Sequence, residues 1–123
     1  MRTIKPTEDQ IQKTVIRWVR LQKFGDYVFH IPNEGPRTPR YGAKMKAMGL
    51  MRGVSDVFIA LPCGDYNGMF IELKREGGKC TPAQSDFLDR MSAVGYKTAV
   101  TYGVEDTITA ISDYINLGHA SLD

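Results

Sequence analysis

The sequence predicts an α/β fold in which helices flank a central mixed β-sheet. Short apolar runs bounded by turn residues indicate strands, and they alternate with longer segments whose apolar residues recur at helical spacing. A hairpin signal in the middle of the chain predicts an antiparallel pair, whereas the strand–helix–strand succession after it predicts a parallel crossover. We therefore expect the order α-β-β-β-α-β-α in one domain over residues 1–123.

The first helix is expected to begin at a capping box. Thr7 is followed three residues later by Gln10, and Ile11 and Val15 then begin an apolar stripe at helical spacing. This helix should end by Gly25. Residues 27–31 ("YVFHI") indicate a short strand that stops at Pro32, and the stretch "YGAKMKAMG" (41–49) after it indicates a short helix.

Two further strands, "SDVFIAL" (55–61) and "MFIELK" (69–74), are joined by "PCGDYNG", a segment dense in turn-forming residues. A second capping box follows at "TPAQ" (81–84), with proline at the favoured first helical position. The apolar stripe of this helix is expected at Phe87, Leu88, Met91 and Val94, with Gly95 ending the helix. "YKTAVTY" (96–102) predicts the last strand, and Val104, Ile108, Ile111 and Ile115 predict the final helix.

Composition excludes several classes of protein. Apolar residues make up 42% and charged residues 24% of the chain, which is ordinary for a globular domain. No segment approaches the ~20 consecutive apolar residues that span a bilayer, and the N-terminus has no secretory apolar region. Cys63 and Cys80 form no C-x-x-C pair, so we expect free thiols in a reducing cytoplasm and no zinc site.

Charge is distributed unevenly along the chain, although the formal net charge is only +2. No acidic residue lies between Glu34 and Asp56, whereas residues 103–123 contain acidic residues and no Lys or Arg. The basic residues of the middle segment are Arg37, Arg40, Lys44, Lys46 and Arg52. This distribution predicts a face that binds a polyanion, and a solvated loop that is merely basic stays open as the alternative.

A pair of carboxylates is expected to meet in the hairpin. If Phe58 pairs with Phe70, then Asp56 lies opposite Glu72 on the same face of the sheet. Like charges placed so are destabilising unless a cation lies between them, and carboxylate oxygens are preferred ligands of hard divalent cations. Lys74 lies ~6.6–7 Å further along that face, which we expect to be exposed, within reach of a water molecule on the metal. The alternative is a surface Glu–Lys pair.

Glu8 lies at the start of the first helix, on the side that carries the apolar stripe. A carboxylate there complements the helix dipole. It could equally reach the carboxylate pair from the side, and the residues alone do not decide between these roles.

Residues 31–100 resemble the virus-type replication-repair nuclease (VRR-NUC) domain, a branch of the PD-(D/E)XK nuclease superfamily. The matching elements are Asn33-Glu34, the basic segment, "GVSD" (53–56), "IELK" (71–74), "TPAQ" (81–84) and Gly95. With Glu8 and the first helix, the resemblance covers nearly the whole chain. It implies a restriction-endonuclease-like core. One departure is Ser55, which stands where the superfamily name has proline.

By this resemblance, Asp56 and Glu72 would ligate Mg²⁺ or Mn²⁺, helped by the backbone carbonyl of Leu73. Lys74 would orient or deprotonate the attacking water. Glu8 would be the acidic residue of the first helix and a possible further metal ligand. Gln84 would be the glutamine that follows the E-x-K strand.

The activity that the resemblance implies is a metal-dependent, structure-directed DNA endonuclease. Its substrate would be branched DNA, such as Holliday junctions in phage or bacterial replication and repair. A junction has two scissile positions, so we expect a homodimer, and the apolar final helix is its candidate interface. A restriction-like or flap-nicking nuclease and a non-catalytic DNA-binding relative are the alternatives.

Overall fold

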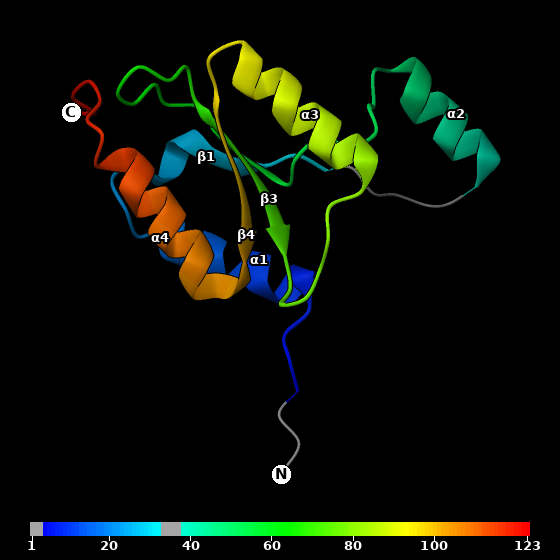
Figure 1. Ribbon diagram of the computed structural model, residues 1–123, viewed down its shortest axis with the longest axis horizontal. Helices are drawn as coiled ribbons and strands as arrows, with labels where there is room; N and C mark the ends of the chain where they lie inside the picture. The colour runs from blue at the N-terminus through cyan, green and yellow to red at the C-terminus, as the bar shows by residue number, and fades with distance from the viewer. Residues whose placement is uncertain (1–3, 33–37) are drawn as a thin grey trace.

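The computed structural model describes residues 4–32 and 38–123, and Asn33, Glu34 and Arg37 lie outside them. The elements are α1 (Glu8–Val19), the 3₁₀ turn η1 (Gly25–Tyr27), β1 (Val28–His30), α2 (Pro39–Ala47), β2 (Val57–Ile59), β3 (Met69–Lys74), α3 (Pro82–Ala93), β4 (Lys97–Tyr102) and α4 (Gly103–Ile115). Figure 1 shows their arrangement. The predicted fold class and succession are confirmed, and α2 is the short helix expected in the basic segment.

One four-stranded mixed sheet has the order β1-β2-β3-β4. The first three strands pair antiparallel, and β4 joins β3 in parallel through the crossover that contains α3. The predicted hairpin register is confirmed, because Phe58 pairs with Phe70 and Val57 with Ile71. Val57 and Ile59 point into the core, so a slip of one residue would turn both toward the opposite face.

The main core lies between one face of the sheet and the helices α1 and α4. Its members are Ile11, Val15 and Val19 of α1, Ile111 and Tyr114 of α4, and Val28, Val57, Ile59, Met69, Ile71 and Leu73 of the sheet. The other face carries an aromatic cluster in which the Phe70 ring packs against Phe58, at 4.4 Å between centroids, and against Phe87 of α3, at 5.1 Å. The sheet is thus covered on both faces at its β3–β4 side.

Both capping boxes are present as predicted. Thr7 accepts from the Gln10 N–H while Gln10 Oε1 accepts from the Thr7 N–H, and Thr81 and Gln84 repeat the pattern. The prediction that Val94 belongs to the apolar stripe of α3 was wrong. It is 60% exposed, because α3 ends at Ala93 and its last turn no longer faces the sheet.

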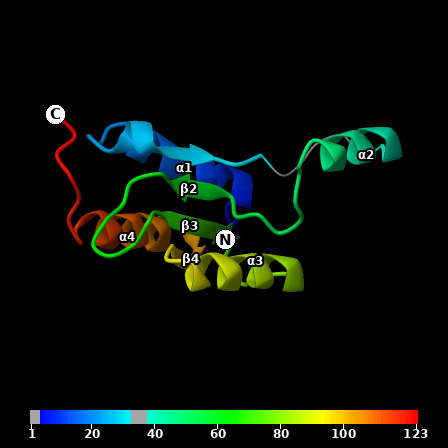
Figure 2. The same ribbon diagram turned by 90° about the horizontal axis from the view of Figure 1, so that it is seen from above.

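The helix α2 stands apart from the body of the protein. It has no buried residue, and Figures 1 and 2 both show it extending away from the sheet. The final helix behaves differently, because Ile111 and Tyr114 are buried and Val104 and Ile115 pack against the core. The apolar pattern of α4 is therefore largely used within the chain.

Gly53 lets the chain that leads into Asp56 approach α3 closely. Its φ is +85°, and a Cβ atom there would lie 2.3 Å from the Ala83 carbonyl oxygen and 2.9 Å from the Gln84 nitrogen. Only glycine combines this left-handed conformation with so close an approach. The segment that carries Asp56 is thereby held against the helix that carries Gln84.

Gly53→Ala is expected to destabilise the protein far more than Gly49→Ala. Gly49 has a comparable φ of +106°, but a Cβ atom there meets nothing within 4 Å, so its substitution adds only backbone strain of about 1–2 kcal/mol. Gly53→Ala adds the clash with α3 to the same strain. Urea denaturation of both variants measures the difference, and equal losses of unfolding free energy would contradict the close packing.

Candidate active site

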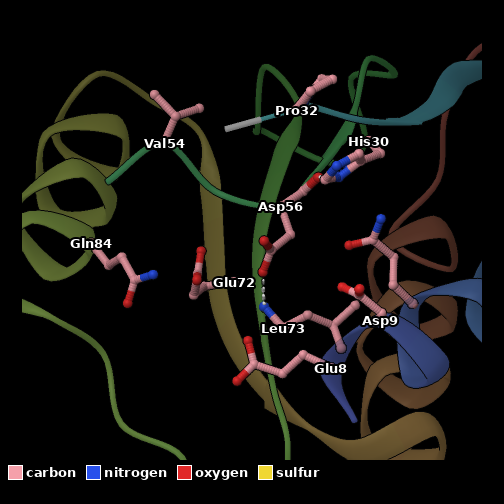
Figure 3. A pocket seen from close by; sticks show the side chains of 10 residues that line it. Glu8, Asp9, His30, Pro32, Val54, Asp56, Glu72, Leu73 and Gln84 are labelled. Carbon is pink, nitrogen blue, oxygen red and sulfur yellow. Dashed lines mark hydrogen bonds between the residues drawn. The ribbon is translucent and has the colours of Figure 1, made fainter. Parts of the chain in front are cut away.

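A pocket of about 250 Å³ opens between the start of α1 and the first turn of α3, where β1 ends, β2 begins and β3 continues. Its lining residues are Glu8, Asp9, Gln12, His30, Pro32, Val54, Asp56, Glu72, Leu73 and Gln84. Figure 3 shows the carboxylates of Glu8, Asp56 and Glu72 gathered in it. All the predicted catalytic and metal-binding residues except Lys74 therefore line one pocket, and Lys74 lies directly behind Glu72.

Asp56 is held from both neighbouring strands. Its Oδ2 accepts a hydrogen bond from the Leu73 N–H at 2.8 Å. Its backbone carbonyl accepts from the Ile31 N–H at 2.9 Å and lies 2.7 Å from His30 Nδ1. A carbonyl only accepts, so Nδ1 carries the proton of this bond. The carboxylate of Asp56 is fixed in position before any ligand enters.

Glu72 is buried, with 2% of its surface exposed, and Lys74 is 6% exposed. The expectation of an exposed strand face was wrong, because α3 and the pocket walls cover this end of the sheet. Glu72 Oε1 lies 3.4 Å from Lys74 Nζ. Its other oxygen, Oε2, is buried and has no hydrogen-bond partner in the part of the chain that the structure describes.

The capping box of α3 also holds the lysine. Gln84 Oε1 accepts from the Thr81 N–H at 2.9 Å and from Lys74 Nζ at 3.0 Å. The same amide oxygen thus caps the helix and positions the ammonium. Gln84 therefore acts on Lys74 through a direct bond, and its pairing with Thr81 limits where that oxygen can move.

The two carboxylates lie in a site with too little positive charge. Burial, together with the negative charge of Asp56, raises the pKa of Glu72 to about 7, although Lys74 opposes both effects. Burial also raises the pKa of Asp56, against the lowering by the Leu73 N–H and Lys74. Near neutral pH the pair therefore tends to retain a proton unless another cation is present.

The residues fit a divalent cation in two respects. The unpartnered Glu72 Oε2 is the kind of buried oxygen that a hard cation would satisfy, and Lys74 does not offset the rise in the pKa values of the pair that burial causes. Within residues 4–32 and 38–123, no three His, Cys, Asp or Glu side chains form a ready metal-binding group. A cation held here would thus rely on two carboxylates, and the predicted contribution of Glu8 stays a prediction.

Two ionisable residues of the pocket were not among the predicted site residues. Asp9 follows Glu8 in the first helical turn, and its carboxylate adds a further negative charge to the pocket wall. For His30 a hydrogen-bonded strand residue was the favoured prediction and a place facing the metal site was the alternative; the ring is hydrogen-bonded and also lines the pocket. The signal for Asp9 was its place beside Glu8, whereas nothing local indicated the position of His30.

The predicted DNA-binding residues that the structure describes lie away from the pocket. Arg40, Lys44 and Lys46 are exposed on α2, and Arg52 is exposed in the turn that follows. None of them lines the pocket, which instead opens beside Pro32 and Val54, where the chain leaves for α2 and returns from it.

A mixed sheet flanked by helices, with an acidic pair and a lysine at the end of its central hairpin, defines a restriction-endonuclease-like nuclease core. The sequence profile of the VRR-NUC domain family matches residues 6–105, and the chain belongs to that family. A solved structure described as a VRR_NUC domain protein is 34% identical, with a TM-score of 0.84 over 94% of this chain and 93% of that one.

No curated protein is detectably similar to the chain. Among the described helices, none has the length and apolar character needed to cross a bilayer. The family membership therefore rests on the domain profile and the structural neighbour, and the geometry of the pocket is consistent with both.

Without divalent cations, the stability of the protein is expected to fall as the pH rises from about 4.5 to about 7. The folded state holds the Glu72 proton more tightly than an ordinary glutamate with a pKa of 4.5 does, so this contribution is complete below pH 4.5 and is lost as the pH passes 7. Glu72→Gln removes this titration. It should match the wild type at pH 4.5 and exceed its unfolding free energy by on the order of 2 kcal/mol at pH 8.

Urea denaturation of both proteins in chelator measures this difference. Asp56 and Glu72 interact, so the difference between the two proteins reports on the titration of the pair that Glu72 completes. A constant difference from pH 4.5 to pH 8 would show that Glu72 has an ordinary pKa.

Proposed function

We propose that the protein is a metal-dependent, structure-directed DNA endonuclease that hydrolyses phosphodiester bonds, with branched DNA such as a Holliday junction as its substrate. The observation that carries this proposal is the meeting of Asp56 and Glu72 at one pocket with Lys74 directly behind Glu72, where a buried carboxylate oxygen lacks a partner among the described residues. Membership of a nuclease family supports the same chemistry.

Asp56 and Glu72 would hold Mg²⁺ or Mn²⁺, with the backbone carbonyl of Leu73 as a third ligand. When bound, such a cation would neutralise charge on the scissile phosphate and make water a better nucleophile. Asp56 is already fixed by Leu73, so it needs little rearrangement to act as a ligand. Glu8 and Asp9 face the same space from α1 and would orient water there.

Lys74 is the residue proposed to act on the attacking water. Its Nζ is held between Gln84 Oε1 and Glu72 Oε1, so its direction is set by two acceptors. An ammonium has three donors and no acceptor, which leaves one N–H for the water or for a phosphate oxygen. Gln84 is accordingly a positioning residue for Lys74.

The basic residues Arg40, Lys44, Lys46 and Arg52, together with Arg37, would contact backbone phosphates without reading the base sequence. The position of α2 supports a branched substrate, because a helix that stands apart from the pocket contacts phosphates distant from the scissile one. A second duplex arm would supply phosphates at that place.

The homodimer and the cytoplasmic location in bacterial or phage-infected cells stay predictions. Two equivalent sites would let one assembly cut both strands of a junction. The packing of α4 against the core leaves less apolar surface for this contact than its sequence pattern indicated.

Lys74→Met is expected to abolish Mg²⁺-dependent cleavage while DNA binding stays within about twofold of the wild type. Methionine keeps the buried aliphatic stem and removes the donors that reach the water. The measurement is a cleavage assay on duplex, flap, splayed and four-way DNA, with binding followed by anisotropy in Ca²⁺. Lys97→Ala, an exposed lysine on β4, is the control and should cleave normally.

Cleavage of four-way DNA by the wild type, with a loss of at least a hundredfold in Lys74→Met, would support the proposal. Wild-type cleavage by the variant would remove Lys74 from the mechanism. Cutting of plain duplex at one sequence would indicate the restriction-like alternative, and binding without cleavage of any substrate would indicate the non-catalytic one.

A further inference from the structure

A second hollow lies between α1 and β1, directly beside the pocket of the carboxylates. Its lining residues are Gln12, Lys13, Ile16, Arg17 and His30. Gln12 and His30 line both hollows, so the two adjoin at these side chains. We call this second hollow the α1 groove.

The pocket and the α1 groove have opposite charge. The first turn of α1 directs Glu8 and Asp9 to the pocket, and the next two turns contribute Lys13 and Arg17 to the groove. Both cations are exposed, and neither has a carboxylate within 4.0 Å in the described part of the chain. Two unpaired cations beside an acidic pocket form a surface that complements an anion.

Arg20, at the C-terminal cap of α1, is a basic residue with a structural role. Its Nη1 donates to the carbonyls of Gly25 at 2.6 Å and Val28 at 2.8 Å, which ties the end of α1 to β1. Arg17 makes no such connection between elements, since its Nη2 donates to Thr14 on the same helix. Lys13 and Arg17 are therefore not needed to join α1 to the sheet.

His30 has a fixed orientation at the boundary of the two hollows. Its Nδ1 lies 2.7 Å from the Asp56 carbonyl oxygen, which holds the ring against the strand that carries Asp56. Its other ring nitrogen, Nε2, has no protein partner among the described residues. The ring thus stands between the site proposed for the scissile phosphate and the cations of the groove.

We propose that the α1 groove binds the backbone phosphates immediately next to the scissile phosphate on the cleaved strand. The inference rests on the proposed nuclease function. Residues four apart on a helix lie about 6 Å apart along its axis, so Lys13 and Arg17 can each contact a different phosphate of the strand. Ile16 between them provides an apolar floor for a sugar.

The groove has a role distinct from that of the basic residues on α2. It adjoins the catalytic pocket, so it sets which bond of the strand enters, whereas α2 contacts DNA away from the cut. Loss of the groove should therefore weaken binding and shift or blur the cleavage position, while loss of the α2 cations should weaken binding alone.

The test compares the wild type with the double variant K13A/R17A by anisotropy in Ca²⁺ over a range of salt concentrations, on duplex-containing DNA that the wild type cleaves in Mg²⁺. Each lost phosphate contact lowers the slope of log K against log salt by about 0.9, so the variant should lose about 1.8. The matched control K23A/K97A also removes two positive charges. It is a control because Lys23 lines another hollow and Lys97 lies over the Tyr66 ring, so neither lines the pocket or the α1 groove. Its slope should stay within about 0.3 of the wild type.

Methylphosphonate substitution, one phosphate at a time, then locates the contact. Neutralising a phosphate next to the scissile one should weaken wild-type binding several-fold and leave K13A/R17A unaffected. A wild-type slope in K13A/R17A, or equal effects of that methylphosphonate on both proteins, would overturn the groove while leaving the nuclease function standing. A wild type that neither binds nor cleaves DNA would overturn the proposed function and the groove with it.

Discussion

The arrangement of the site depends on one constraint: Glu72 is buried beside the carboxylate of Asp56, and the ammonium of Lys74 lies next to the pair. Glu72 is almost fully covered, Asp56 faces it across the hairpin, and Lys74 offsets only part of their charge. A buried, incompletely compensated pair is destabilising for a small domain. A bound cation would offset this destabilisation, and the Glu72 Oε2 atom, which has no partner among the described residues, is the atom that it would contact.

Several unrelated features of the fold serve to hold this pair. The β2–β3 register sets Asp56 opposite Glu72, the Leu73 N–H fixes the Asp56 carboxylate, and Gly53 lets the intervening chain approach α3. The capping box of α3 supplies the oxygen that directs Lys74. The start of α3, the β2–β3 register and the geometry of the site therefore depend on shared hydrogen bonds. A substitution that alters one of these features is expected to alter the others.

Local patterns predicted what depends on local chemistry. Turn residues and alternation predicted the hairpin and its register, and Thr-x-x-Gln predicted both helix starts, because these follow from hydrogen bonds within a few residues. The joint pattern around Asp56, Glu72 and Lys74 predicted a common site. The burial of Glu72 and Lys74 was not predicted, since alternation in a strand says nothing of which helix covers its polar face.

Tertiary packing also decided the other differences. His30 and Asp9 line one pocket only because the fold brings the start of α1 near the end of β1, and nothing in the sequence of α2 indicated that this helix would stand apart. The apolar residues of α4 were expected to exceed the needs of one core, but α1 and the sheet cover most of them. None of these placements is encoded in the spacing of neighbouring residues.

The most direct test of a cation site between Asp56 and Glu72 is titration calorimetry of Mn²⁺ binding near pH 7, in two buffers that differ in ionisation enthalpy. The wild type should bind Mn²⁺ and release protons, because a cation displaces the proton that Glu72 retains at its pKa of about 7. Glu72→Gln should lose this binding. Equal Mn²⁺ binding by both proteins, with no proton release, would contradict a metal site built on this buried pair.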